Sequence, residues 1–429
     1  MRLRNTTRRQ SRAATPILCC GPVLLLIIFS AAPCSGYSVL THEAILDSVW
    51  ESQIRPLLLK RFPHSTQEEL QEAHAYLYGG SLTQDMGYAP LAARFFTDLT
   101  HYVRSGDFVA SLIQSAEALN EFAFALGALA HYAADARGHP VINRITGLVY
   151  PKLVAKFGEE VTYCDSPASH LKTEFGLDVV QVSRGLYAPD AYHAFIGFQV
   201  AEPVLKRAFQ ATYGLEWKDV FRASDVAVGT YRFSVGKLIP EMTKVAWQSK
   251  KKDLEKLRPG ITRSQFVYVL PRKKYESEWG NHYSRPGFLA RILAVLLRVV
   301  PRFGPFKVLA FPVVPSKAEP MFLKSFESTV EYYRSLLKEV GSGRTSFPNH
   351  NLDTGKAAQA GDYKLADQTY MRLVDKLATH HFASLAPDLR ENILQYFGTA
   401  HGAAAVSLKT QQQLSELRAK ELTELSNRH

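Results

Sequence analysis

Cysteine is scarce in this chain of 429 residues, which contains four. Three of them, Cys19, Cys20 and Cys34, lie within the first 36 residues, and Cys164 is the fourth. If the first 36 residues are removed, the remaining cysteine cannot form a disulfide within the chain. This excludes a fold that depends on a framework of disulfides. An exported protein would then rely on its apolar core or on bound metal ions for rigidity.

Strand patterns are few, and internal repeats and low-complexity tracts are lacking. Apolar residues instead recur at helical spacing along most of the chain. Gly79-Gly80 is expected to end the second helix, and Gly138 with Pro140 to end the long central one. We therefore predict an all-α fold, in which a multi-helix domain is followed by a helical C-terminal extension. Helices are expected over residues 41–59, 70–78, 91–103, 107–135, 322–337, 356–379 and 408–425.

Acidic residues are absent from the first 36 positions, where five arginines precede an apolar run over residues 17–32. A basic start, an apolar run and then small residues are the parts of a secretory signal peptide. We expect cleavage between Gly36 and Tyr37, and export to the periplasm or to the exterior. An uncleaved membrane anchor is the alternative, although the run is short for a span of about 20 residues.

Positive charge is concentrated in one segment. The formal net charge of the chain is +11, and residues 250–307 contain 14 basic and 4 acidic residues. We therefore predict one domain over residues 37–250 and a basic, mostly helical region of unknown role over 251–429. Residues 288–307 are apolar with interspersed arginines, a pattern that fits contact with an anionic membrane surface. A helix packed on the rest of the protein, with its arginines in solvent, is the interpretation that we favour.

A nine-residue segment reads HYAADARGH and places His131, Asp135 and His139 four residues apart. On a helix, residues with this spacing lie above one another on the same face. His170 and Glu174 repeat the spacing further along the chain. Imidazole nitrogens and carboxylate oxygens in such a ladder are metal ligands. A polar helix end that faces water would show the same pattern, so the ladder by itself leaves both interpretations open.

The order of these residues resembles the zinc-dependent phospholipase C/D domain family. That family includes the bacterial zinc phospholipases C and the glycosylphosphatidylinositol-specific phospholipase D, and the fungal single-strand-specific nucleases share its metal architecture. Its ligands follow the order mature N-terminal residue, histidine, aspartate, histidine, HxxxD, histidine and Hxxx(E/D). The matching residues here are Tyr37, His42, Asp85, His101, His131, Asp135, His139, His170 and Glu174.

The resemblance implies three Zn²⁺ ions and a multi-helix catalytic domain similar to phospholipase C and the nucleases. One ion would be held by Asp85, His101, His131 and Asp135. A second would be held by the α-amine and carbonyl of Tyr37, by His42 and by Asp135, which would bridge the pair. The third would be held by His139, His170 and Glu174. Asp85 is also expected to act in catalysis as a proton acceptor.

The implied activity is that of an exported zinc-dependent phosphoric diester hydrolase of the phospholipase C/D type, acting on phospholipid head groups through a zinc-activated water. Its partner would be a phospholipid or a membrane surface. Glu174 favours phospholipases, because the nucleases have aspartate there, and the short spacing from Asp135 to His139 is that of the phospholipase D branch. Met86 and Asp98 stand where the bacterial enzymes have two aromatic residues of their choline pocket, which argues against choline specificity.

Two alternatives remain at this point. A zinc-dependent single-strand nuclease would have nucleic acid as its partner. A non-catalytic envelope protein would use the metal ions to stabilise its fold. The oligomeric state is not predicted.

Overall fold

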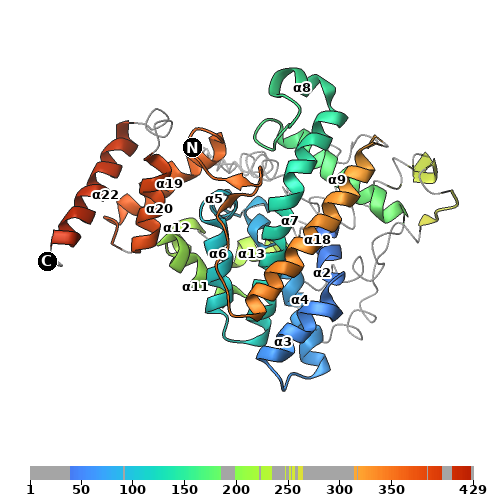
Figure 1. The fold of residues 1–429 in the computed structure, drawn as a ribbon, viewed down its shortest axis with the longest axis horizontal. Helices are drawn as coiled ribbons and strands as arrows, with labels where there is room; N and C mark the ends of the chain where they lie inside the picture. Colours follow the sequence, from blue (N-terminus) through green and yellow to red (C-terminus); the bar gives the residue numbers. More distant parts are fainter. Residues whose placement is uncertain are drawn as a thin grey trace, which may run out of the picture.

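The computed structural model describes residues 39–89, 92–184, 199–221, 224–233, 247, 251–252, 254–256, 259–263, 314–315, 317–383, 385–398 and 408–426. Within these residues the fold is all-α, as predicted (Figure 1). The strands among them are β1 (His350–Asn351) and β2 (Lys356–Ala357), which pair antiparallel as a hairpin. The predicted signal peptide, Tyr37 and the basic segment 288–307 lie outside the described residues.

The helical elements fall into two groups along the chain. The first group is α2 (Val39–Asp47), the π-helical turn η1 (Trp50–Ile54), α3 (Arg55–Arg61), α4 (Gln67–Ser81), the 3-10 helix η2 (Thr83–Tyr88), α5 (Arg94–Tyr102), α6 (Ser105–Ser115), α7 (Leu119–Val149), α8 (Pro151–Phe157) and α9 (Pro167–Arg184). The second group is α11 (Glu202–Tyr213), α12 (Trp217–Val220), α13 (Ser224–Phe233), α18 (Ala318–Gly341), α19 (Lys364–Thr379), α20 (Pro387–Phe397) and α22 (Leu408–Ser426).

The α7 helix is the centre of the fold. Every side chain from Phe122 to Ala136 is buried, as expected for a helix that is apolar on all faces. α4, α6 and α9 pack on it, and α18 lies along it, although α18 comes more than 160 residues later in the chain (Figure 1). Residues far apart in the sequence therefore meet along one helix.

The expected end of a helix at Gly79-Gly80 is wrong, because α4 continues to Ser81. The two glycines permit close packing instead of ending the helix. A Cβ atom on Gly80 would lie 1.9 Å from the carbonyl oxygen of Phe124, and one on Gly127 would lie 2.0 Å from that of Leu77. α4 and α7 therefore cross with their backbones in contact, which only glycine permits.

The expected single helix over 107–135 is also wrong in its bounds. Residues 105–115 form α6, and α7 then runs from Leu119 through Pro140 to Val149. A proline inside a helix lacks one N–H, which here would bond the carbonyl of Ala136. The burial of α7 on several sides outweighs that loss. His139 consequently stays on the same helix as His131 and Asp135.

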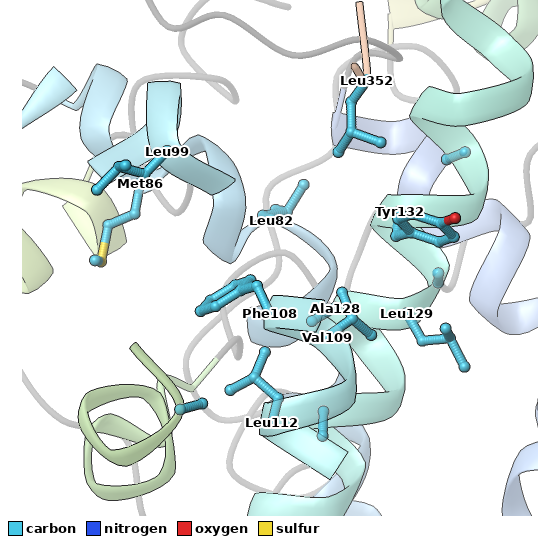
Figure 2. Close-up of a cluster of buried hydrophobic side chains, with 14 of the residues drawn as sticks. Leu82, Met86, Leu99, Phe108, Val109, Leu112, Ala128, Leu129, Tyr132 and Leu352 are labelled. Atoms are coloured by element: carbon cyan, nitrogen blue, oxygen red, sulfur yellow. The ribbon is translucent and has the colours of Figure 1, made fainter. Parts of the chain in front are cut away.

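The described C-terminal helices share a hydrophobic core with the N-terminal ones. α19 packs on α5, and α22 packs on α19. Leu352, from the turn between β1 and β2, is buried in the same cluster as Leu82 and Tyr132 (Figure 2). The domain boundary near residue 250 stays a prediction. In the part of the chain that the structure describes, no helix combines the length and apolar character that a membrane span requires.

Candidate metal centre

The ladder of α7 is buried, so the water-facing interpretation of HYAADARGH does not hold. His131 and Asp135 have no exposed surface, and His139 is 3% exposed. Three further elements bring side chains to this face: α2 brings His42, η2 brings Asp85, and α5 brings His101. The α9 helix adds His170 and Glu174. The structure thus brings together all eight of the predicted ligands that it describes.

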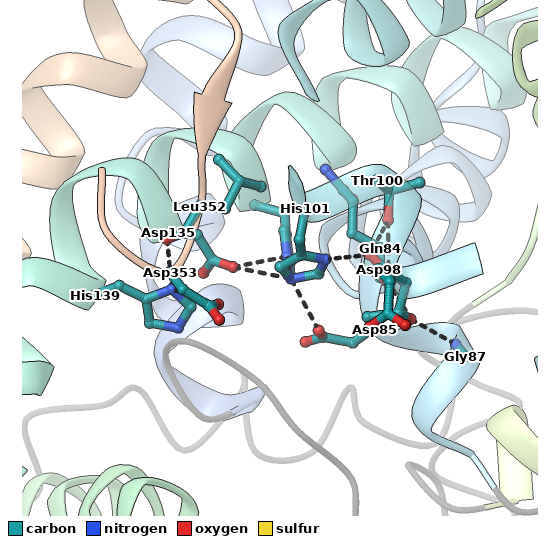
Figure 3. Close-up of polar contacts among 12 residues, drawn as sticks. Gln84, Asp85, Gly87, Asp98, Thr100, His101, Asp135, His139, Leu352 and Asp353 are labelled. Carbon is teal, nitrogen blue, oxygen red and sulfur yellow. Dashed lines mark hydrogen bonds and ion pairs between the residues drawn. The ribbon is translucent and has the colours of Figure 1, made fainter. Parts of the chain in front are cut away.

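Five of these residues surround one carboxylate and are called the Asp135 cluster: His42, Asp85, His101, His131 and Asp135. The Oδ1 atom of Asp135 lies 3.6 Å from Nε2 of His42. Its Oδ2 atom lies 3.3 Å from Nε2 of His101 and 3.1 Å from Nε2 of His131. Nε2 of His101 also lies 3.4 Å from Oδ1 of Asp85 (Figure 3). The two oxygens of Asp135 therefore face different histidines.

The remaining three residues form the Glu174 cluster: His139, His170 and Glu174. One oxygen of Glu174 lies 2.6 Å from Nε2 of His170 and 3.8 Å from Nε2 of His139. The two imidazole rings are 5.4 Å apart, edge to face. Two helices supply this cluster, because His139 follows the Asp135 cluster by one turn of α7 while α9 carries the other two residues.

The spacing of the ligand atoms fits bound zinc. Two ligands at about 2.0 Å from one tetrahedral ion lie about 3.3 Å apart. The nitrogen-to-oxygen distances around Asp135, from 3.1 to 3.6 Å, lie close to that value. Both oxygens of Asp85 and both oxygens of Asp135 are buried, and they accept no hydrogen bond of normal geometry from the described residues. Buried carboxylates without donors are costly, and a bound cation removes that cost.

Backbone carbonyls orient three of the histidines. Nδ1 of His131 donates to the carbonyl of Ser81 at 2.8 Å, and Nδ1 of His101 donates to that of Thr97 at 2.9 Å. Nδ1 of His139 donates to the carbonyl of Leu352 at 2.5 Å. A carbonyl only accepts, so each Nδ1 carries a proton and each Nε2 is the ring nitrogen left to face the carboxylates. This is how metal-binding histidines are held in proteins.

Burial shifts the pKa values of His42, His170 and Glu174. Burial, together with the nearby His131, lowers the pKa of His42 to about 3. Burial, together with His139, lowers the pKa of His170 to about 3. Both imidazoles are therefore neutral at physiological pH, the form that binds metal. Burial also raises the pKa of Glu174 well above its ordinary value, with the charges of Asp135 and Asp85 adding to the effect.

The pKa of Asp135 is shifted downward, in the opposite direction to that of Glu174. Burial acts to raise its pKa, but His131, His139 and His101 outweigh burial and hold the pKa well below the ordinary value. Asp135 is thus a buried anion among imidazoles. A cation between its oxygens and the facing nitrogens would satisfy both kinds of atom.

Two residues that sequence reasoning missed lie against His139. Leu352 and Asp353 belong to the turn between β1 and β2, more than 210 residues downstream of His139. The Oδ1 atom of Asp353 lies 3.5 Å from Nδ1 of His139 (Figure 3). Asn351-Leu-Asp353-Thr-Gly355 reads as an ordinary polar turn, so the local sequence carries no signal of this contact.

Comparison with known proteins agrees with the geometry. Residues 41–222 match the sequence model of a family described as zinc dependent phospholipase C. A search of curated proteins and a search of solved structures each gave no match. The matched segment contains every described residue of the Asp135 and Glu174 clusters and ends before α18. Residues 41–222 of this all-α chain are therefore similar to the zinc-dependent phospholipase C family.

Proposed function

We propose that this protein is an exported phosphodiesterase that hydrolyses phospholipids by C-type cleavage, with three zinc ions. The family supports a phospholipase C-type hydrolase and phospholipid substrates. The proposal of three ions rests on the position of Asp135, whose two oxygens face different histidines. Asp135 could thereby serve two ions, while the Glu174 cluster would hold the third.

The three ions would be held by the residues expected from the sequence. Asp85, His101, His131 and Asp135 would hold the first. His42 and Asp135 would hold the second, with the α-amine and carbonyl of Tyr37 completing it after signal cleavage. The assignment of Tyr37 to this ion is supported by its closeness in sequence to His42. The α2 helix begins two residues after Tyr37 and carries His42, which has no exposed surface. His139, His170 and Glu174 would hold the third.

Zinc ions bound here would polarise the phosphoryl oxygens of a phosphodiester and lower the pKa of a water molecule. We assign Asp85 the role of accepting the proton of that water. Its side chain is 7% exposed, whereas that of Asp135 is fully buried, so Asp85 is the carboxylate of its cluster nearer to solvent. A proton acceptor must lie within reach of the attacking water, and we therefore assign the role to Asp85 and not to Asp135.

Two tyrosines and an arginine lie beside the clusters. The ring of Tyr88 lies 6.4 Å from that of His101, and the ring of Tyr163 lies 6.1 Å from that of His170. The two tyrosine rings are 6.1 Å apart, so together they connect the surroundings of the two clusters. The half-exposed Arg94 lies over both rings and 3.7 Å from Asp98, and its positive charge beside the clusters would favour an anionic phosphodiester.

The test is product analysis with the zinc-loaded, full-length protein. It is incubated with vesicles of phosphatidylcholine or of phosphatidylethanolamine, and diacylglycerol and phosphatidate are quantified. We expect diacylglycerol, its loss after chelation and its return when zinc is added. Phosphatidate instead would indicate D-type cleavage. Hydrolysis of single-stranded DNA without lipid hydrolysis would favour a nuclease, and retained zinc without any hydrolysis would indicate a structural metal centre.

Export is tested separately, by sequencing the N-terminus of the protein recovered outside the cytoplasm. The proposal expects Tyr37 as the first residue. An intact N-terminus on a membrane-bound chain would support the uncleaved anchor and would remove the Tyr37 α-amine from the second zinc site.

A further inference from the structure

The hairpin over residues 350–357, called the β1–β2 hairpin, contacts the metal centre. It lies outside residues 41–222, which match the family model. The N–H of Leu352 donates to the carbonyl of His101 at 3.0 Å, and the carbonyl of Leu352 accepts from Nδ1 of His139 at 2.5 Å. Leu352 therefore contacts one ligand candidate of each cluster. The chain leading to the hairpin is held by Tyr132, which donates to Pro348, and by Ser105, which donates to His350.

The hairpin contacts α7 beside Pro140, and Gly355 of the hairpin permits the close approach. Pro140 has no N–H, so the carbonyl of Ala136 lacks its usual helical partner. Gly355 covers this carbonyl, and a Cβ atom there would lie 2.4 Å from its oxygen. Gly355 also has a φ of +67°, which favours glycine. The turn thus packs against α7 between Asp135 and His139.

Asp353 is held in one orientation beside His139. Its Oδ2 atom accepts hydrogen bonds from the hydroxyls of Tyr102, at 2.8 Å, and Tyr363, at 2.5 Å. Its backbone carbonyl accepts from Asn143 of α7 at 2.8 Å. The Oδ1 atom is left facing Nδ1 of His139 at 3.5 Å, and the whole side chain is buried. Two hydrogen bonds to the carboxylate and one to the backbone therefore fix the position of this negative charge.

We propose that Leu352 and Asp353 are positioning residues for the zinc ion held by the Glu174 cluster. This rests on the third zinc ion of the proposed function. The Leu352 carbonyl keeps the proton of His139 on Nδ1, so that Nε2 faces His170 and Glu174. The Asp353 carboxylate stabilises the positive charge that the imidazole gains when Nε2 binds a cation, which makes His139 a stronger ligand. The region after residue 250 thereby has a role in the metal centre.

Asp353→Asn in the full-length protein tests this proposal. Asparagine keeps the size of the side chain and an oxygen that can accept from Tyr102 and Tyr363, but it removes the charge. We expect zinc to fall from three toward two ions per chain during dialysis against a chelator. Affinity at the weakened site should fall about 10- to 100-fold, the usual effect of losing such a partner.

Asp367→Asn is the matched control. Asp367 lies in the same part of the chain and also accepts from a tyrosine, with hydrogen bonds from Tyr396 and Gly361. We expect this variant to keep three zinc ions. Melting temperatures are measured with zinc and after complete chelation. A positioning role predicts that Asp353→Asn reduces the increase in melting temperature that zinc produces, while the metal-free protein melts near the wild-type temperature.

Tyr363→Phe decides the question if Asp353→Asn does not fold. It removes one of the two hydroxyls that hold the carboxylate. This variant should also lose zinc, but less than Asp353→Asn is expected to lose. Wild-type protein that binds fewer than three zinc ions would contradict the third ion of the proposed function. Three ions in the wild type, with unchanged zinc affinity in both variants, would overturn the positioning role. Equal zinc loss in Asp367→Asn would overturn it also, because the effect would then be a general loss of structure.

Discussion

Asp135 and His42 approach each other across two helices, with Oδ1 of one 3.6 Å from Nε2 of the other, and both side chains are fully buried. The second oxygen of Asp135 faces His101 and His131 instead. One carboxylate thus divides its oxygens between candidate ligands from three different elements. This makes Asp135 the residue whose loss should affect two ions together.

Replacement of Asp135 by asparagine tests that relationship. We expect the protein to lose two zinc ions and to keep the one at the Glu174 cluster. Hydrolysis should fall more than about 100-fold, because loss of a ligand exceeds the 10- to 100-fold effect of losing its outer partner. Zinc per chain and the rate of diacylglycerol release are measured on the same preparation. Retention of three ions at wild-type affinity would contradict the bridging role.

The stability of the metal-free protein should depend on Asp98. Burial raises the pKa of Asp98 from 3.8 to about 6, against the opposing charge of Arg94. The folded state therefore binds this proton more tightly than the unfolded state. Stability falls as pH rises from about 4 to 6, and the loss is complete above that range. The difference between the two pKa values corresponds to roughly 3 kcal/mol.

Asp98→Asn should remove this pH dependence. At pH 8 the metal-free variant is expected to unfold at a higher denaturant concentration than the wild type, and near pH 4 the two should unfold together. Asp388→Asn gives a contrast of opposite sign. Burial acts to raise the pKa of Asp388, but its contacts with Arg104 outweigh burial and lower the pKa. That substitution should destabilise the protein at neutral pH, and a gain in stability by Asp98→Asn at pH 4 would be inconsistent with this account.

Gly355→Ala should weaken the docking of the β1–β2 hairpin. Its Cβ would lie 2.4 Å from the carbonyl oxygen of Ala136, so the turn must move away from α7. Gly343→Ala is the control, because Gly343 has a φ of +85° but nothing within 4 Å of the added atom. The control should cost about 1 to 2 kcal/mol from backbone strain alone. Gly355→Ala should cost about 1 to 3 kcal/mol more.

Denaturant unfolding of the two glycine variants measures this difference. If the hairpin supports the metal centre, Gly355→Ala should also release zinc from the Glu174 cluster faster than Gly343→Ala does. Equal stability of the two variants would mean that the turn accommodates the methyl group and that the close contact with Ala136 is not required.

Much of the fold and part of the centre follow from local pattern. Helical spacing of apolar residues predicts an all-α chain because a helix must bury one face. The spacing of four residues in His131, Asp135 and His139 places them on one face of any helix that contains them. His170 and Glu174 follow the same rule. These statements need only the geometry of one helix, so sequence can support them.

The glycines show where local pattern fails. Gly79-Gly80 was expected to end a helix, and Pro140 was expected to end another, yet α4 and α7 continue through them. Propensity disfavours both residues inside a helix. Burial of the crossing between α4 and α7 outweighs that preference at the glycines, and the burial of α7 outweighs it at Pro140. The crossing depends on backbone contacts that no single segment encodes.

The sequence by itself determined the helical class, the ladder on α7 and the order of candidate ligands that resembles the family. Each depends on residues near one another in the chain or on their order along it. Only the tertiary structure decided that Asp135 stands between His42 and His131, and that Asp353 lies beside His139. The physical reason is that these contacts join separate elements. Their distances are set by how helices and a hairpin pack around α7, not by the spacing of residues within any of them.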